Sequence, residues 1–289
     1  MSLALPEPRP CDIALDGRRI EAAWWGPGPE AAPSVVMLHE GLGCVALWRD
    51  VPARIAAATG LGVLAYSRFG YGRSDPVPLP RPLTYLHEEA LGVLPRVLEA
   101  AAIRRCILFG HSDGASIAAI HAGSREDARV RGLVLMAGHY MVEAAGMPAL
   151  LETRRRYEEG DLRARLARHH AHVDVAFRGW SEAWTDPRFA AAFDLAGELA
   201  RIRVPVLVVQ GEADPYGTLE QVRVVEREAR RCPVETLVLP GVGHAPHLEA
   251  PEAVLAAVRD FAARLLHAGG PADEKAPEPA GAVAVARSA

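Results

Sequence analysis

Six short apolar segments alternate with amphipathic segments along most of this chain. The apolar segments are rich in Val, Ile and Leu and are bounded by Gly, Pro or charged residues, a pattern typical of buried parallel strands. They are Ser34–Leu38, Val63–Tyr66, Cys106–Phe109, Leu133–Ala137, Val206–Gln210 and Val234–Leu239. Apolar residues three and four positions apart predict helices at Leu47–Ala58, Tyr85–Ala101, Asp113–His121, Leu219–Arg230 and Glu252–Leu266. This alternation predicts an α/β fold.

Two weaker strand patterns precede these segments. Cys11–Leu15 and Ile20–Trp25 flank the dipeptide Asp16-Gly17, and an Asp-Gly pair between apolar runs favours an antiparallel hairpin. We expect this hairpin at the edge of the sheet. The prediction is therefore a mostly parallel sheet of about eight strands, flanked by helices.

The alternation of predicted strands and helices is interrupted between Gly146 and Ala200. About 55 residues there carry Arg, Glu, Ala and Trp at helical spacing, and a connection of this length is too long for an ordinary loop. We predict one core domain, residues 1–145 and 201–267, with a helical cap inserted at 146–200. Residues 268–289 combine Gly, Pro and Ala without periodicity, so we expect a disordered tail.

Composition and charge narrow the function. The net charge of −4 argues against a nucleic-acid surface, and no apolar run reaches the roughly 18 residues that cross a bilayer. The first ten residues lack the pattern of a secretory signal, so a cytoplasmic location is expected. Four scattered cysteines, with no C-x-x-C pair, indicate neither disulfides nor a zinc site. We expect a small-molecule substrate, no cofactor and no metal, and leave a homodimer open.

The strongest chemical signal is Gly110-His111-Ser112-Asp113-Gly114. It matches G-x-S-x-G between a predicted strand and a predicted helix, the context in which this motif forms a tight turn that exposes a nucleophilic serine. The turn places Ser112 at a helix N-terminus, where N–H groups stabilise developing negative charge. Ser112 is the predicted nucleophile.

A serine hydroxyl needs a general base and a carboxylate that orients it. Gly241-Val242-Gly243-His244 follows the last predicted strand, so His244 is the expected base, while His247 is the alternative at the start of the next helix. The preceding strand leads into Asp214-Pro215, which predicts Asp214 as the carboxylate. Glu212 is the alternative carboxylate.

These residues occur in the order Ser, Asp, His, and the chain from about Ile13 to Leu266 resembles the α/β-hydrolase superfamily. The family's H-G-x-x-G element has its counterpart in His39-Glu40-Gly41-Leu42-Gly43, with Glu40 in place of glycine. The resemblance implies an oxyanion hole formed by the backbone N–H of Asp113 and that of Gly41, or alternatively Leu42.

Glu40 and Asp113 place two carboxylates beside a site for negative charge. Arg68 and Arg73, in the loop after the fourth strand, are their expected partners, and such buried pairing is commoner than substrate contact. We expect His39, Glu40, Trp180 and Trp184 to contact the substrate. The cap aromatics, among them Phe189 and Phe193, serve equally well as pocket walls or as the core of the cap.

Two other cap features are less specific. His170-Ala171-His172-Val173-Asp174 resembles the start of a metallo-hydrolase signature but lacks its continuation, so surface histidines on a helix are expected instead. The arginines between 154 and 168 lie among acidic residues at helical spacing, which favours ion pairs on a solvated face over a rim that attracts anions.

The predicted reaction is hydrolysis of a small carboxylic ester or lactone through an acyl-enzyme. Serine at the centre of the G-x-S-x-G turn excludes the haloalkane dehalogenases and epoxide hydrolases of the superfamily, which use aspartate at that position. Alternatives are a thioesterase and a C–C bond hydrolase of ring-cleavage products, although those enzymes usually have asparagine where His111 stands. Members of the superfamily that are not hydrolases remain alternatives of a different class. These are non-hydrolytic lyases, and ligand receptors that retain the Ser, His and Asp residues.

Overall fold

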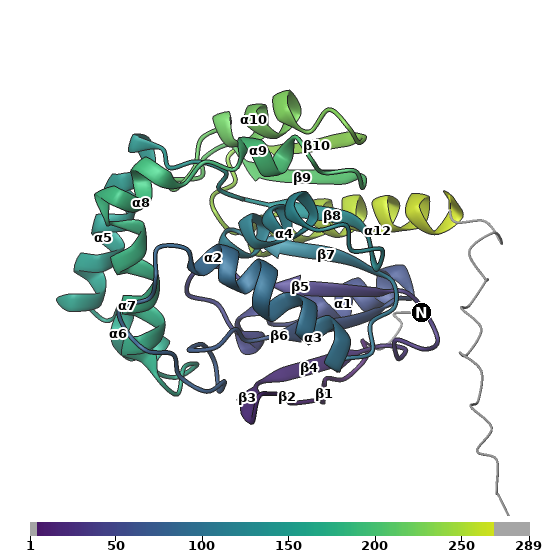
Figure 1. Cartoon of the computed structure of the whole chain (residues 1–289), viewed down its shortest axis with the longest axis horizontal. Helices are drawn as coiled ribbons and strands as arrows, with labels where there is room; N and C mark the ends of the chain where they lie inside the picture. The colour runs from purple at the N-terminus through teal and green to yellow at the C-terminus, as the bar shows by residue number, and fades with distance from the viewer. Residues whose placement is uncertain (1–4, 269–289) are drawn as a thin grey trace, which may run out of the picture.

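A mixed eight-stranded sheet forms the centre of the chain (Figure 1). The computed structural model describes residues 5–268. The strand order is β1-β4-β6-β5-β7-β8-β9-β10. Strand β4 runs antiparallel to both of its neighbours, β1 and β6, and every neighbouring pair from β6 to β10 is parallel. The strands of this sheet are β1 (Arg9–Pro10), β4 (Ala22–Trp25), β5 (Ser34–Leu38), β6 (Gly62–Tyr66), β7 (Cys106–His111), β8 (Val130–Met136), β9 (Val206–Gly211) and β10 (Val234–Leu239).

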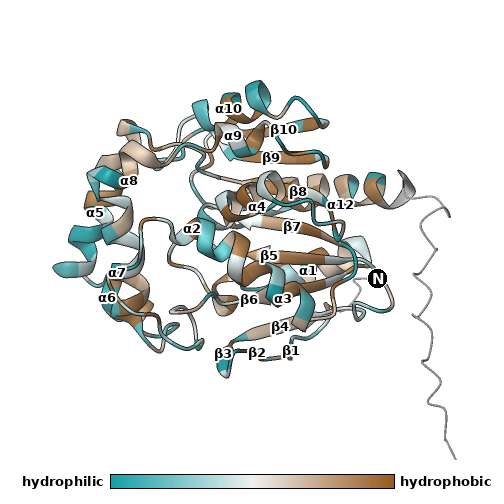
Figure 2. Cartoon of the chain, in the orientation of Figure 1, coloured by the Kyte–Doolittle hydropathy of each residue, from teal (hydrophilic) through white to brown (hydrophobic). Residues whose placement is uncertain are grey.

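Helices cover both faces of the sheet. Apolar residues of α1 and α12 pack on one face, and those of α3, α4 and α10 pack on the other. Figure 2 shows the strands as mostly hydrophobic, with polar residues on the outer sides of the helices. The helices outside the cap are η1 (Val45–Trp48), α1 (Val51–Thr59), α2 (Tyr85–Glu88), η2 (Glu89–Val93), α3 (Leu94–Ala100), α4 (Asp113–Ser124), α10 (Glu220–Glu228), α11 (Pro246–Glu249) and α12 (Pro251–Ala268).

The predicted α/β class and parallel sheet are confirmed, but the N-terminal hairpin was placed wrongly. Its turn forms at Asp16 and Gly17, both with positive φ, yet β2 (Ile13–Leu15) and β3 (Arg18–Ile20) make a separate two-stranded sheet. Their apolar residues pack with α3 instead of extending the main sheet. Glu21 interrupts the predicted second strand, because its backbone N–H donates to the Ser74 hydroxyl and its backbone oxygen accepts from the Ser67 N–H.

A helical insertion, which we call the cap, lies between β8 and β9 at the carboxyl edge of the parallel strands (Figure 1). Its apolar side chains belong to the same buried cluster as those of α4, so the cap packs directly on the core. Ala268, the first residue of the predicted tail, still belongs to α12, and the rest of that prediction falls outside the described residues. The cap helices are η3 (Ala144–Gly146), α5 (Met147–Glu158), α6 (Leu162–Leu166), α7 (Val173–Trp184), α8 (Pro187–Ala192) and α9 (Ala196–Leu199).

Candidate active site

Ser112 occupies a strained turn between β7 and α4. Its backbone has φ 52° and ψ −116°, a conformation that L-residues adopt only when their surroundings impose it. A side chain at Gly110 would collide with the backbone of Gly114, and one at Gly114 would collide with that of Leu38. The two glycines therefore permit the close packing of strand and helix that holds the serine in this conformation.

Asp214 and His244 meet at the same edge of the sheet. Asp214 follows β9, His244 follows β10, and Nδ1 of His244 lies 2.7 Å from Oδ2 of Asp214. Burial would raise the pKa of Asp214, but the hydrogen bond and charge of His244 outweigh it and hold that pKa below its ordinary value. An ionised Asp214 accepts the Nδ1 proton, which leaves Nε2 of His244 as a proton acceptor.

The alternative residues lie elsewhere. His247, in α11, is buried between other rings, with its centroid 5.2 Å from that of Trp48 and 4.8 Å from that of His111. Glu212 is exposed on the loop before Asp214. Among the candidates from the sequence, the structure thus pairs only Asp214 with His244.

The residues that carry the predicted oxyanion donors line the same cavity as Ser112. Gly41, Leu42 and Asp113 all line it, and within residues 5–268 their backbone N–H groups have no acceptor. A Cβ on Gly41 would collide with the indole of Trp180. Cap helix α7 therefore rests on the loop that carries two of these donors.

The Asp113 side chain is a buried junction between core and cap. Its carboxylate accepts hydrogen bonds from Tyr85 Oη at 2.7 Å and from Trp184 Nε1 at 3.1 Å. Arg68 lies 3.3 Å away, and both charged side chains are at most 1% exposed. The expected pairing of Arg68 with Asp113 is confirmed, and it neutralises the carboxylate next to Ser112.

Glu40 does not pair with an arginine, contrary to expectation. Its carboxylate lies 3.6 Å from Nδ1 of His111, because the Arg68 guanidinium binds the backbone oxygen of Glu40 instead. Nε2 of His111 donates to the backbone oxygen of His244 at 2.7 Å. Glu40, His111 and the loop of His244 are thus connected.

Two further expectations need correction. Arg73 is exposed and its side chain binds neither Glu40 nor Asp113. His39 is fully buried behind the cavity, where Nδ1 donates to the Glu40 backbone oxygen and Nε2 accepts from the Arg68 N–H. Both ring nitrogens are occupied, so His39 shapes the loop and does not line the cavity.

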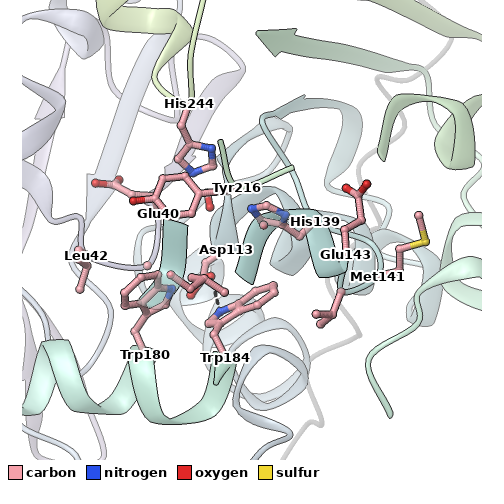
Figure 3. Close-up of a pocket in the computed structure, with 15 residues that line it drawn as sticks. Glu40, Leu42, Asp113, His139, Met141, Glu143, Trp180, Trp184, Tyr216 and His244 are labelled. Atoms are coloured by element: carbon pink, nitrogen blue, oxygen red, sulfur yellow. Dashed lines mark hydrogen bonds between the residues drawn. The ribbon is translucent and has the colours of Figure 1, made fainter. Parts of the chain in front are cut away.

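A cavity of about 190 Å³ lies between the cap and the core (Figure 3). Trp180 and Trp184 of α7 lie on one side of it, and His244 and Tyr216 lie on the opposite side. Its lining residues are Glu40, Gly41, Leu42, Ser112, Asp113, His139, Met141, Val142, Glu143, Gly146, Leu150, Trp180, Trp184, Tyr216 and His244.

His139 is a lining residue that the sequence reasoning missed. It follows β8 on the loop Gly138–Tyr140, and its ring stacks on that of His244 with centroids 5.7 Å apart. Burial, followed by the charge of His244, lowers the pKa of His139 to about 3, so the imidazole stays neutral. Its position after a parallel strand was the available signal, since such loops converge on the site.

Some aromatic residues of the cap line the cavity, and others pack in the interior of the cap. Trp180 and Trp184 line the cavity, whereas Phe189 and Phe193 stack on each other with centroids 4.8 Å apart. His170, expected at the surface, is buried because its ring binds the Gly72 N–H and the Leu42 oxygen.

The outer face of the cap carries the expected ion pairs. Arg154 pairs with Glu158, Arg155 pairs with Glu152, and Asp174 binds Arg163. Asp174, the last residue of the metal-like pattern, also accepts from the Tyr157 hydroxyl. Histidine, cysteine and carboxylate side chains of residues 5–268 form no cluster of three suited to a metal ion.

Comparison with known proteins agrees with this architecture. Residues 35–258 match the model of the alpha/beta hydrolase family, and the chain belongs to that family. Membership supports a hydrolase as the coarse class of function. No curated protein matches the chain.

Several solved structures share the fold. The enol-lactonase from Burkholderia xenovorans LB400 is 21% identical, with a TM-score of 0.65 over 87% of this chain and 99% of that one. The naproxen esterase from Bacillus subtilis is 16% identical, with a TM-score of 0.68 over 89% and 92%. The proline iminopeptidase from Mycobacterium smegmatis is 20% identical, with a TM-score of 0.65 over 90% and 99%. None of the helices within residues 5–268 has the length and apolarity to cross a membrane.

Proposed function

We propose that this protein hydrolyses a small carboxylic ester or lactone with Ser112 as nucleophile, His244 as general base and Asp214 as the orienting carboxylate. The observation that carries the proposal is the 2.7 Å contact of His244 with Asp214 beside the strained turn of Ser112, all at one cavity. A serine, an imidazole and a buried carboxylate in this arrangement supply the nucleophile and the proton transfers of acyl transfer.

The proposed reaction has two halves. Ser112 Oγ attacks the carbonyl carbon while its proton passes to Nε2 of His244, and the leaving alcohol then takes that proton as its bond to the acyl carbon breaks. Water attacks the acyl-serine in the second half, with His244 again accepting a proton and returning it to Ser112. The N–H groups of Asp113 and Gly41, or Leu42, would bind the oxyanion, and losing one such donor typically costs about 3 kcal/mol.

The size and character of the cavity support a small substrate. Much of its wall is apolar, formed by Leu42, Val142, Leu150 and the two tryptophans. The cap covers the cavity, which favours a small molecule over a polymer. Two proteins of the same fold, the enol-lactonase and the naproxen esterase, are named for activity on this kind of bond, which supports the proposal.

Replacing Ser112 tests this function. The Ser112→Ala protein should lose at least about three orders of magnitude in kcat on short-chain p-nitrophenyl esters, because the acyl-enzyme can no longer form. A fluorophosphonate probe should label the parent protein and not the variant. Undiminished ester turnover by Ser112→Ala, or a labelled parent protein that hydrolyses no ester, lactone or thioester, would contradict the proposal.

A further inference from the structure

The charged groups at the wall of the cavity are predominantly acidic. Besides Asp113, whose charge Arg68 neutralises, the lining includes the carboxylates of Glu40 and Glu143 and the apolar side chains named above. Within the described residues no lysine or arginine lines the cavity. A substrate group lying beyond the scissile carbonyl therefore meets negative charge and apolar surface, with no cationic side chain to receive an anion.

Glu40 is held at this wall. Its carboxylate packs over the Cα of Gly43, where any Cβ would collide with it, and 29% of its side chain remains exposed. Desolvation opposes its ionisation, but the adjacent His111 outweighs this and keeps the pKa of Glu40 below the ordinary value. Glu40 is thus a fixed acidic group and not a mobile surface side chain.

Glu143 is held in place by neutral donors. Its two carboxylate oxygens accept from the backbone N–H and hydroxyl of Thr218, at 3.0 and 2.5 Å, and from Gln221 Nε2 at 2.7 Å. These donors satisfy the oxygens without cancelling the charge. The cap arginines are used elsewhere, since those that form ion pairs do so on the outer face.

We propose that the cavity selects its substrate by charge: it accepts uncharged or cationic acyl or alkoxy groups and excludes anionic ones, with Glu40 and Glu143 as the residues that set this preference. The inference rests on the proposed function only in identifying the cavity as the substrate site. A like charge brought into a partly desolvated cavity is repelled and must also lose its hydration. Esters that carry a carboxylate on the acyl chain should therefore be poor substrates.

Binding of non-hydrolysable ligands tests the preference without any turnover. Fluorescence of Trp180 and Trp184, which line the cavity, would report the binding of 3-phenylpropanol, 3-phenylpropylammonium and 3-phenylpropionate, three ligands of matched shape. We expect the Kd of the anion to exceed that of the alcohol by at least about tenfold at low salt, with the difference shrinking at high ionic strength. Equal affinities for alcohol and anion would overturn the proposal.

Isosteric variants assign the effect to the two carboxylates. Glu40→Gln and Glu143→Gln remove a charge and keep the shape, so each should reduce the alcohol-to-anion ratio, and the double variant should reduce it most. Glu212→Gln is the matched control, because Glu212 is exposed near Asp214 and does not line the cavity. An unchanged ratio in the double variant would refute the assignment, since a purely structural loss weakens all three ligands alike.

Hydrolysis of two esters that differ in charge provides a second test of the preference. The p-nitrophenyl ester of pentanoic acid should exceed the mono-p-nitrophenyl ester of glutaric acid in kcat/KM by at least about tenfold, and the double variant should narrow this gap. A protein that hydrolyses neither ester yet binds the alcohol better than the anion would contradict the proposed reaction and support the charge preference. Equal kcat/KM for the two esters would contradict the charge preference and leave the reaction supported.

Discussion

Single residues at the site have distinct electrostatic tasks. Asp214 is the proposed orienting carboxylate of His244, and hydrogen bonds from Gln210 Nε2 at 2.9 Å and from the Tyr216 N–H at 2.9 Å hold it in place. Asp113 is neutralised by Arg68, so its side chain anchors the structure while its N–H remains available. Neighbouring carboxylates therefore differ in role because their partners differ.

The charge of Asp214 can be removed without removing its shape. The Asp214→Asn protein should lose about three to four orders of magnitude in kcat on a neutral ester, because the amide no longer favours the tautomer with the proton on Nδ1 of His244. Steady-state kinetics at neutral pH measure the loss. Glu212→Gln, two positions earlier, should stay within about twofold of the parent protein, and a comparable loss there would contradict the assignment of Asp214.

Between elements, the contact of α7 with the start of α4 connects the cap to the turn that carries Ser112. Trp184 of α7 donates to the carboxylate of Asp113 and lies 2.8 Å from the Tyr85 hydroxyl. Trp180, one helical turn earlier, covers Gly41 on the oxyanion loop. One helix thus contacts both loops that carry the proposed oxyanion donors.

Trp184→Phe tests this connection. The variant keeps an aromatic ring but leaves Asp113 without one buried donor, which should lower the free energy of unfolding by about 1–3 kcal/mol. Trp180→Phe is the matched control, since within residues 5–268 the Trp180 indole N–H has no hydrogen-bond acceptor. Urea unfolding of both variants gives the comparison, and equal losses would show that the Trp184 hydrogen bond contributes nothing specific.

For the whole molecule, buried neutral histidines should make stability depend on pH. Burial, followed by the charges of nearby histidines, lowers the pKa values of His139 and His247 to about 3. In the unfolded chain each imidazole titrates near its ordinary value of about 6.5. The unfolded state therefore binds more protons below that pH, so stabilisation present above about 6.5 is lost as pH falls toward 3.

His247→Gln should flatten this dependence. Between pH 6 and pH 4 the slope of unfolding free energy against pH should decrease by up to about 1.4 kcal/mol per pH unit, the value for one proton. Denaturant unfolding across this range measures the slope. His172→Gln replaces an exposed imidazole and should keep the parent slope. An unchanged slope in His247→Gln would mean that this group is not neutral in the folded chain.

The sequence by itself determined most of the elements and the order of the candidate catalytic residues. Apolar runs located β5 and β10 to the residue, and the Asp16-Gly17 turn was found where it forms. Such signals are local, because strand and helix periodicity and turn conformation depend on residues close in the chain. The motif order also singled out Ser112, Asp214 and His244, since parallel strands bring their carboxyl ends to one edge.

Only the tertiary structure decided which side chains meet. Arg68 and Arg73 are equivalent by sequence, yet one is buried against Asp113 and the other is exposed. Glu40 faces His111 instead of an arginine, and His139 enters the cavity from a loop without any motif. These contacts join segments far apart in the chain, so they depend on how the cap and loops pack on the sheet, and packing of this kind leaves no periodic trace in the sequence.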